Sequence, residues 1–237
     1  MTPAPKSVWI TRTRPGADRT AARVRALGHR PLVAPLLVVE ATDAAPAPQG
    51  WDIAFTSPNG VAHYRGATGS TAWCVGAATA EAARAAGFAD VRTGPGDVEG
   101  LTGLLLAEGA RPLLHWAGAH VRGALVETLR KAGREAGRRT AYRARAVEAL
   151  PPDVAEAAPV DAVLFHSPRA SEVFAALSGD RRLALTSVCL SPATDAPLGG
   201  GLATKPAFVR CVATRPTEDA LMDALVAALD ETREGTA

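Results

Sequence analysis

The 237-residue sequence lacks several features that mark membrane, exported and nucleic-acid-binding proteins. Its apolar runs, such as residues 104–107, are far too short to span a membrane, and no apolar signal region stands at the amino terminus. The net charge is only +2 and no basic stripe stands out, which argues against a nucleic-acid partner. We therefore expect a cytoplasmic protein that contacts neither membrane nor nucleic acid.

Cysteine is scarce, and no strong catalytic motif is present. Cys74, Cys189 and Cys211 are isolated, odd in number and inside expected strands, so we interpret them as small core residues. The chain has no Gly-x-Ser-x-Gly elbow, no phosphate-binding P-loop, no Cys-x-x-Cys and no metal-spaced histidine pair. The sequence therefore predicts no metal site and offers no familiar nucleophile.

The chain does contain a short pattern that occurs twice. Residues 52–60 (DIAFTSPNG) and 161–169 (DAVLFHSPR) each read as a short buried strand followed by Ser-Pro, a typical helix start. A second landmark recurs in residues 73–79 and 188–194, where a threonine follows a cysteine by five positions. We interpret the repeat as two similar α/β lobes. The alternative is a chance similarity between two ordinary strand–helix units.

Strands alternate with helices along most of the chain, which indicates βαβ units and parallel sheets. Residues 32–42 and 138–148 depart from this rhythm, and we interpret them as paired connectors. The predicted fold is therefore α/β, with two Rossmann- or flavodoxin-like lobes joined by a two-stranded connector and the active site in the cleft between them. The first lobe would comprise residues 1–38 and 148–237, and the second, inserted lobe residues 39–147.

Hydroxyl side chains recur at the expected carboxyl ends of the strands, where open α/β sheets bind anionic ligands. They belong to Thr11, Ser57, Thr79, Ser167, Thr194 and Thr217, and the arginines Arg12, Arg14 and Arg169 lie at the same ends. Together they predict a surface that binds a ligand with many carboxylates. Each hydroxyl alone also fits a helix N-cap, and codon bias accounts for most of the 23 arginines that stand against three lysines.

Tyr142 is one of only two tyrosines and lies in the second expected connector. Its phenol could donate a proton or a hydrogen bond, although packing within the connector is the plainer interpretation. His63, His115, His120 and His166 fall near strand ends or helix starts, where a histidine is more often a structural hydrogen-bonding group than a catalyst.

Short motifs along nearly the whole chain carry a resemblance through their order and spacing. They are Thr11-Arg12 with Pro15, Gly28 with Pro35, residues 55–61 (FTSPNGV) and 75–80 (VGAATA), Tyr142-Arg143, Ser167-Pro168, and Pro216-Thr217 with Ala220-Leu221. In this pattern the sequence resembles the uroporphyrinogen-III synthase family. It departs from the family at Ser191, where many members have glycine, and in the turn at residues 166–169.

The resemblance implies an enzyme of tetrapyrrole (haem) biosynthesis, a cyclising hydro-lyase. Such an enzyme converts hydroxymethylbilane, a linear tetrapyrrole octacarboxylate, to uroporphyrinogen III with loss of water, ring closure and inversion of ring D. It would use no metal or organic cofactor and act as a monomer, with transient contact with the preceding pathway enzyme left open. Tyr142 would assist departure of the hydroxyl, and Ser57, Thr79 and Thr217 would hold substrate carboxylates. Asn59 and Gly60 are expected as further substrate-binding residues. The alternative is a non-catalytic two-lobed binder or sensor of an anionic small molecule.

Overall fold

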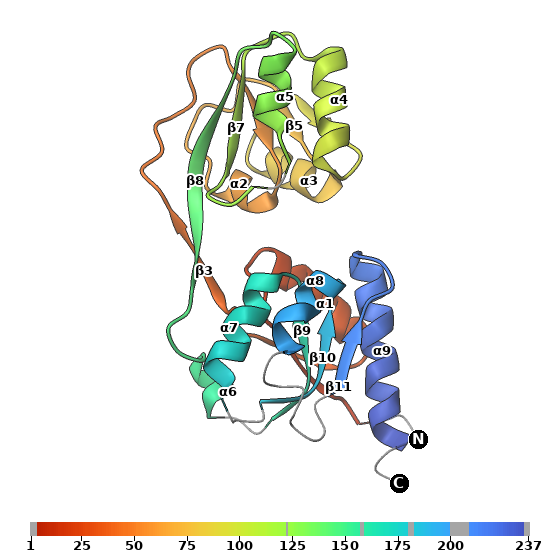
Figure 1. Ribbon diagram of the computed structural model, residues 1–237. Coiled ribbons are helices and arrows are strands. Elements are labelled where there is room, and N and C mark those ends of the chain that lie inside the picture. Colours follow the sequence, from red (N-terminus) through yellow and green to blue (C-terminus); the bar gives the residue numbers. More distant parts are fainter. Residues whose placement is uncertain (1–3, 122, 157–158, 180–182, 200–208, 235–237) are drawn as a thin grey trace. The chain divides into compact units, whose positions relative to one another are not determined.

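The chain forms two compact units (Figure 1). The computed structural model describes residues 4–121, 123–156, 159–179, 183–199 and 209–234. Unit 1 comprises Met1–Val38 and Arg145–Ala237, and unit 2 comprises Val39–Ala144. Unit 2 is therefore an insertion in the sequence of unit 1.

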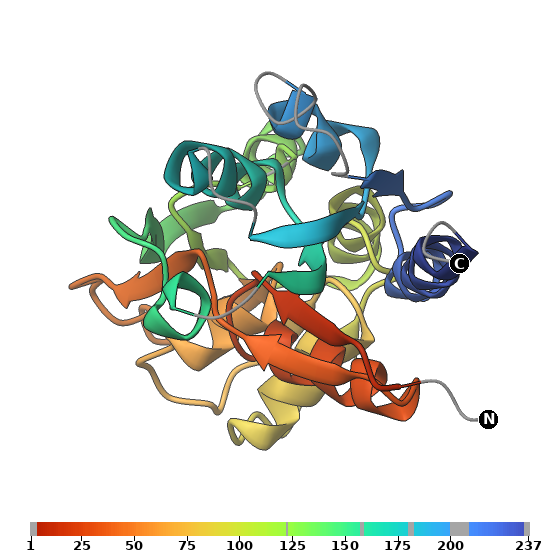
Figure 2. The ribbon, with the colours of Figure 1, turned by 90° about the horizontal axis from the view of Figure 1, so that it is seen from below.

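Unit 1 is built on a parallel sheet with the strand order β11-β10-β9-β1-β2 among the described residues. Its elements are β1 (Ser7–Ile10), α1 (Gly16–Ala26), β2 (Arg30–Val33), α6 (Pro152–Ala155), β9 (Val160–Phe165), α7 (Pro168–Ser178), β10 (Ala184–Cys189), α8 (Pro192–Asp195), the 3-10 helix η1 (Ala196–Gly199), β11 (Val209–Val212) and α9 (Glu218–Glu234). Successive side chains of a strand point to opposite faces. Val8 and Ile10 therefore pack with α1 and α9, whereas Trp9 packs with α7 on the other face. The ribbons of these helices lie on opposite faces of the sheet in Figure 2.

Unit 2 is built on a second sheet with the order β3-β8-β7-β4-β5-β6. Its elements are β3 (Leu37–Ala41), β4 (Asp52–Phe55), α2 (Pro58–Ala62), β5 (Ala72–Cys74), α3 (Ala77–Ala85), β6 (Val91–Thr93), α4 (Val98–Glu108), β7 (Leu113–Gly118), α5 (Leu125–Lys131) and β8 (Ala136–Ala146). Ile53 and Phe55 pack with α2 and α3 on one face, and Ala54 packs with α4 and α5 on the other. The pairs from β8 through β6 are parallel. The prediction of an α/β fold with mostly parallel sheets is confirmed.

The sequence repeat corresponds to equivalent elements in the two units. Phe55 lies opposite Cys74 in the β4–β5 pair, and Phe165 lies opposite Cys189 in the β9–β10 pair. The strand order β6-β5-β4-β7-β8 of unit 2 recurs in unit 1 as β11-β10-β9-β1-β2. Matching register and matching order confirm two similar α/β lobes and remove chance similarity as an explanation. Burial also supports the expected core role of Cys74 and Cys189, because it raises the pKa of each thiol to about 12.

The two stretches expected to connect the lobes pair with each other. The Thr42 amide donates to the Ala141 carbonyl over 3.0 Å, and the Val147 amide donates to the Leu36 carbonyl over 3.1 Å. Part of each stretch nevertheless belongs to a sheet, since β2 pairs with β1 and the first half of β8 pairs with β7. Only β3 and the end of β8 therefore serve as connectors between the two units. No helix in the described part of the chain is both long enough and apolar enough to cross a bilayer.

Candidate functional site

Each sheet has one place where the strand order reverses. In unit 2 this place lies between β4 and β7, and in unit 1 it lies between β1 and β9. Loops that leave neighbouring strands there diverge toward opposite faces of the sheet, and the crevice outside the carboxyl ends of such strands is the usual ligand site of α/β folds. Both copies of the Ser-Pro motif follow a strand at this place.

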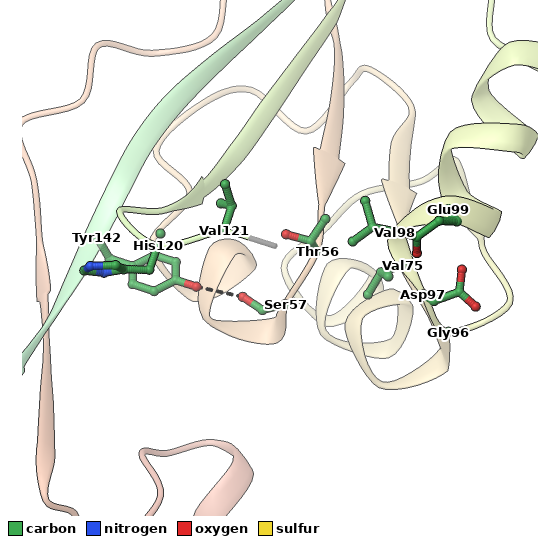
Figure 3. A pocket seen from close by; sticks show the side chains of 11 residues that line it. Thr56, Ser57, Val75, Gly96, Asp97, Val98, Glu99, His120, Val121 and Tyr142 are labelled. Carbon is green, nitrogen blue, oxygen red and sulfur yellow. Dashed lines mark hydrogen bonds between the residues drawn. The ribbon is translucent and has the colours of Figure 1, made fainter. Parts of the chain in front are cut away.

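A cavity of about 610 Å³ opens at the reversal point of unit 2. It is lined by residues that follow the carboxyl ends of β4 to β7 and by one residue of β8: Thr56, Ser57, Val75, Gly96, Asp97, Val98, Glu99, Gly118, His120, Val121 and Tyr142. In Figure 3, Tyr142 and His120 lie at one side of the cavity and Asp97 and Glu99 at the other, with Thr56 and Ser57 between them. The cavity thus combines hydroxyls, valines and carboxylates.

Tyr142 and Ser57 meet inside this cavity, with 2.9 Å between their hydroxyl oxygens (Figure 3). Ser57 also caps α2, because its Oγ accepts a hydrogen bond from the Gly60 amide at 3.2 Å. The Tyr142 ring lies over Gly118, where a Cβ would come within 2.7–3.0 Å of three ring and hydroxyl atoms. The ring centroid of His63 is 5.4 Å from that of Tyr142. The phenol is therefore held at the cavity by contacts on several sides.

Gly60 is required by the packing of α2. A Cβ there would lie 2.8 Å from the Trp116 carbonyl oxygen of β7, which cannot move without disturbing the sheet. Glycine therefore lets the first turn of α2 approach the end of β7. This approach places Ser57, and with it Asn59, at the reversal point. Sequence reasoning selected both residues from the motif alone.

Thr56 has a partner that the sequence did not suggest. Its Oγ1 is 2.9 Å from Nε2 of His115, a β7 residue whose surface is only 3% exposed. The pKa of the imidazole is lowered to about 4, mainly by burial. The positive charge of Arg138 also lowers this pKa, and its effect is larger than the opposing effect of Glu127. His115 is therefore neutral at physiological pH, and it lies directly behind the cavity wall.

A network of charged side chains occupies the corresponding end of the sheet in unit 1. Glu218, the first residue of α9, accepts hydrogen bonds from Arg12 at 3.1 Å and from Thr20 at 2.5 Å, and it contacts Nε2 of His166 at 3.2 Å. Burial opposes ionisation of Glu218, but the hydrogen bonds from His166 and Thr20 and the charge of Arg12 lower its pKa to about 2. Burial lowers the pKa of His166 as well. The carboxylate thus ties α9 to the ends of β1 and β9.

A family model described as uroporphyrinogen-III synthase HemD matches residues 18–223, most of the chain. The chain belongs to the uroporphyrinogen-III synthase family.

Solved structures of two synthases resemble this one. The uroporphyrinogen-III synthetase of Helicobacter pylori is 14% identical, with a TM-score of 0.63 over 94% of this chain and 99% of that chain. A mutant of the Thermus thermophilus uroporphyrinogen III synthase is 18% identical, with a TM-score of 0.44 over 95% and 99% of the two chains. No curated protein sequence matches the chain. The first of these likenesses shows a shared fold.

In this synthase-family chain, several expected carboxylate ligands already have intramolecular partners. Thr11 is fully buried, and its hydroxyl donates to the Leu164 carbonyl at 2.7 Å. Arg12 lies over Gly16 and pairs with Glu218, and Arg14 pairs with Asp18 at the surface. These contacts give Thr11, Arg12 and Arg14 structural roles, so their substrate contacts remain predictions.

The remaining candidates lie at helix starts. Ser167 caps α7 by accepting from the Ala170 amide at 3.3 Å, with Arg169 half-buried beside it, and Thr217 precedes α9 with its Oγ1 3.3 Å from the Ala220 amide nitrogen. Thr194 and Thr79 are buried within the first turns of α8 and α3. Of these helix-start residues, only Thr217 is exposed. Its hydroxyl is therefore the most accessible to a ligand.

Sequence reasoning missed part of the cavity wall: Thr56, Val75, Asp97, Val98, Glu99, Gly118, His120 and Val121. The sequence held a signal for Thr56, because this residue directly precedes Ser57 at the carboxyl end of the same expected strand. Asp97 would have been found as an N-cap, since it accepts from the Gly100 amide at 2.7 Å. Within the described residues, no three His, Cys, Asp or Glu side chains gather closely enough to hold a metal ion.

Proposed function

We propose that this protein acts as a uroporphyrinogen-III synthase, a cyclising lyase of tetrapyrrole biosynthesis. Its substrate would be hydroxymethylbilane, which loses its terminal hydroxyl as water, closes the macrocycle and inverts ring D. The observation that supports the proposal is the Tyr142–Ser57 pair in the cavity of a chain whose family is uroporphyrinogen-III synthase. The alternative of a non-catalytic binder is not favoured, because the family consists of enzymes.

Tyr142 is proposed to be the general acid for departure of the hydroxyl. The phenol can donate its proton to the leaving oxygen, so that water departs and an azafulvenium cation remains on the terminal ring beside the phenolate. Loss of the pyrrole N–H proton then gives the neutral azafulvene, and return of a proton to the phenolate restores the phenol. Ser57 lies 2.9 Å from the phenol oxygen and can donate a hydrogen bond to the phenolate or accept one from the phenol. The packing of the Tyr142 ring on Gly118 limits its rotation, which favours a defined direction of proton transfer.

The helix starts are proposed to hold substrate carboxylates. A helix N-terminus has free amide groups and a positive dipole end, and both favour an anion. The exposed Thr217 at the start of the 17-residue helix α9 is the leading candidate for such a contact. Ser57, Asn59, Gly60, Thr79, Ser167, Arg169 and Thr194 are proposed as further contacts. For Arg12, binding a substrate carboxylate would require exchange of its partner Glu218.

A turnover experiment separates the enzyme from a binder. Catalytic amounts of protein are given hydroxymethylbilane that is generated in situ, and the linear substrate and cyclic product are followed with time. The proposal predicts many equivalents of product for each protein molecule. Substrate that is bound one-to-one and released unchanged would instead indicate a sensor. The cytoplasmic location and the monomeric state expected from the sequence are also proposals, and analytical ultracentrifugation measures the second.

A further inference from the structure

His115 is buried in the middle of the unit 2 sheet, yet it contacts a residue of the cavity wall. It pairs with Ala54 of β4 on one side and with Arg138 of β8 on the other, so its backbone is fixed between two strands. Its imidazole nitrogen Nε2 lies 2.9 Å from Oγ1 of Thr56, and Thr56 lines the cavity. The strand pairing therefore places a rigid hydrogen-bonding group behind the wall.

Strand alternation explains why these two side chains meet. Thr56 follows Ala54 by two residues, so both side chains lie on the face of the sheet that α4 and α5 cover. His115 follows Leu113 by two residues on the neighbouring strand, and Leu113 packs on the same face. The contact is thus a diagonal one between neighbouring strands at the edge of the cavity, and it joins positions 59 apart in sequence.

A threonine hydroxyl can turn its proton in several directions, and one strong partner selects among them. The ring of His115 is held by burial and by its strand, and burial keeps it neutral, with a pKa of about 4. In the His115 tautomer that carries its proton on Nδ1, Thr56 donates its hydrogen bond to Nε2, and the lone pairs of Oγ1 remain available toward the cavity. The cavity wall then presents the Thr56 oxygen as a hydrogen-bond acceptor with a fixed direction.

Charge on the other wall decides which substrate group fits there. Asp97 and Glu99 line the same cavity, opposite Tyr142 (Figure 3). Two carboxylates disfavour a carboxylate arm of the substrate on their side of the cavity by like-charge repulsion. They favour a hydrogen-bond donor such as a pyrrole N–H. Val75 and Val98 supply apolar surface against which a flat ring can pack.

We propose that His115 is a positioning residue, which directs the Thr56 hydroxyl so that its oxygen accepts a hydrogen bond from a pyrrole N–H of the substrate. This inference rests on the proposed function and adds Thr56 as a substrate contact. His115 acts only through Thr56, so removal of either partner should remove the same interaction.

A double-mutant cycle on the full-length protein tests this coupling. Thr56→Val and His115→Met each remove the hydrogen bond with little change of volume, and each should lower kcat/KM for type III formation roughly 3- to 10-fold. The double variant should fall no further than the lower single variant. Thr56→Ser and His115→Gln keep a polar atom at the contact and should recover most of the lost activity. Circular dichroism and thermal melting check that each variant is folded.

Two results would overturn the inference: a folded His115→Met protein with wild-type kcat/KM, or losses that multiply in the double variant. If His115→Met fails to fold, nitrogen-15 NMR of the wild type and of Thr56→Val detects the hydrogen bond between His115 and Thr56 instead. Thr56→Val should then shift the Nε2 resonance of His115, and an unmoved resonance overturns the proposal. Wild-type protein that yields only the type I isomer would refute the proposed function instead, whatever the variants do.

Discussion

Tyr142 and Ser57 place two hydroxyls in contact at the end of the unit 2 sheet. The phenol can donate a proton and the serine can hydrogen-bond to it, which suits a reaction whose first step is loss of a hydroxyl. The contact joins positions 85 residues apart, and Gly118 makes room for the phenol. At the residue scale, the proposed chemistry therefore depends on one phenol held in a defined place.

Tyr142→Phe is expected to lower kcat about 100-fold while KM changes little, because phenylalanine keeps the packing on Gly118 but cannot donate a proton. Steady-state kinetics of type III formation measure both constants. Tyr64→Phe is the matched control, since the Tyr64 hydroxyl donates to the Ala67 carbonyl and does not line this cavity. Equal rates for Tyr142→Phe and the wild type would remove the general-acid role.

His115 is expected to make stability depend on pH. Its folded pKa of about 4 lies below the ordinary value of 6.5, so the unfolded state binds the proton more readily. The stabilisation is complete above pH 6.5 and is lost as the pH falls through 4. The full loss is about 3 kcal/mol, since one pKa unit corresponds to about 1.4 kcal/mol.

Denaturant unfolding of the wild type and of His115→Gln at several pH values between 7 and 4 measures this term. The difference between the two free energies of unfolding should shrink as the pH falls, because glutamine does not titrate. Taking this difference cancels the contributions of His63 and His166, whose pKa values burial also lowers. A difference that stays constant across this pH range would contradict the assignment of a buried, neutral His115.

At the scale of elements, the start of α9 combines two proposed roles. Thr217 caps the helix and is exposed, while Glu218 anchors the same turn to β1 and β9. Thr217→Val is expected to cost about 1 kcal/mol of stability through loss of the cap, and to raise KM severalfold through loss of the hydroxyl. Thr217→Ser, which keeps the oxygen, is the control. An unchanged KM in Thr217→Val would leave the residue only its capping role.

Glu218→Gln tests the anchoring of α9. Removing the charge leaves Arg12 half-buried without its partner, so a loss of about 2 kcal/mol in the free energy of unfolding is expected. Asp219→Asn is the matched control on the next residue. It removes a pair with Arg23 in which the Asp219 side chain is 80% exposed, so it should change stability by less than about 0.5 kcal/mol. Equal stabilities of the two variants would show that the network does not anchor the helix.

Local patterns in the sequence were sufficient for many elements. The Ser-Pro starts of α2 and α7 and the acidic start of α9 each depend on neighbours within a few residues. The partner of Arg12 could not be predicted in the same way, because Glu218 lies 206 positions away and meets it only after β1 and α9 have packed. From the sequence alone, Arg12 was therefore expected to be available for binding a ligand.

The cavity wall was harder to predict for a related reason. Ser57 and Tyr142 were found through motifs, but Thr56 and His115 meet only because β4 and β7 pair in one particular register. A shift of one residue would turn His115 to the other face of the sheet. Register depends on the whole sheet, which the sequence pattern of a single strand does not determine.

The whole molecule uses one arrangement of five strands twice and assigns different side chains to equivalent places. Asp97 caps α4 after β6, and Thr217 occupies the corresponding place before α9, after β11. A carboxylate in unit 2 and a hydroxyl in unit 1 imply different ligand groups. We infer that the side of the unit 2 cavity lined by Asp97 and Glu99 contacts the pyrrole rings, and that the start of α9 binds substrate carboxylates.

Resolution of the product isomers tests the central claim most directly. Hydroxymethylbilane is generated in situ with and without the wild-type protein, and the cyclised products are separated into types I and III. The account predicts predominantly type III with the protein, well above the control without it. Type I alone, at the spontaneous rate and from protein shown to be folded, would contradict it.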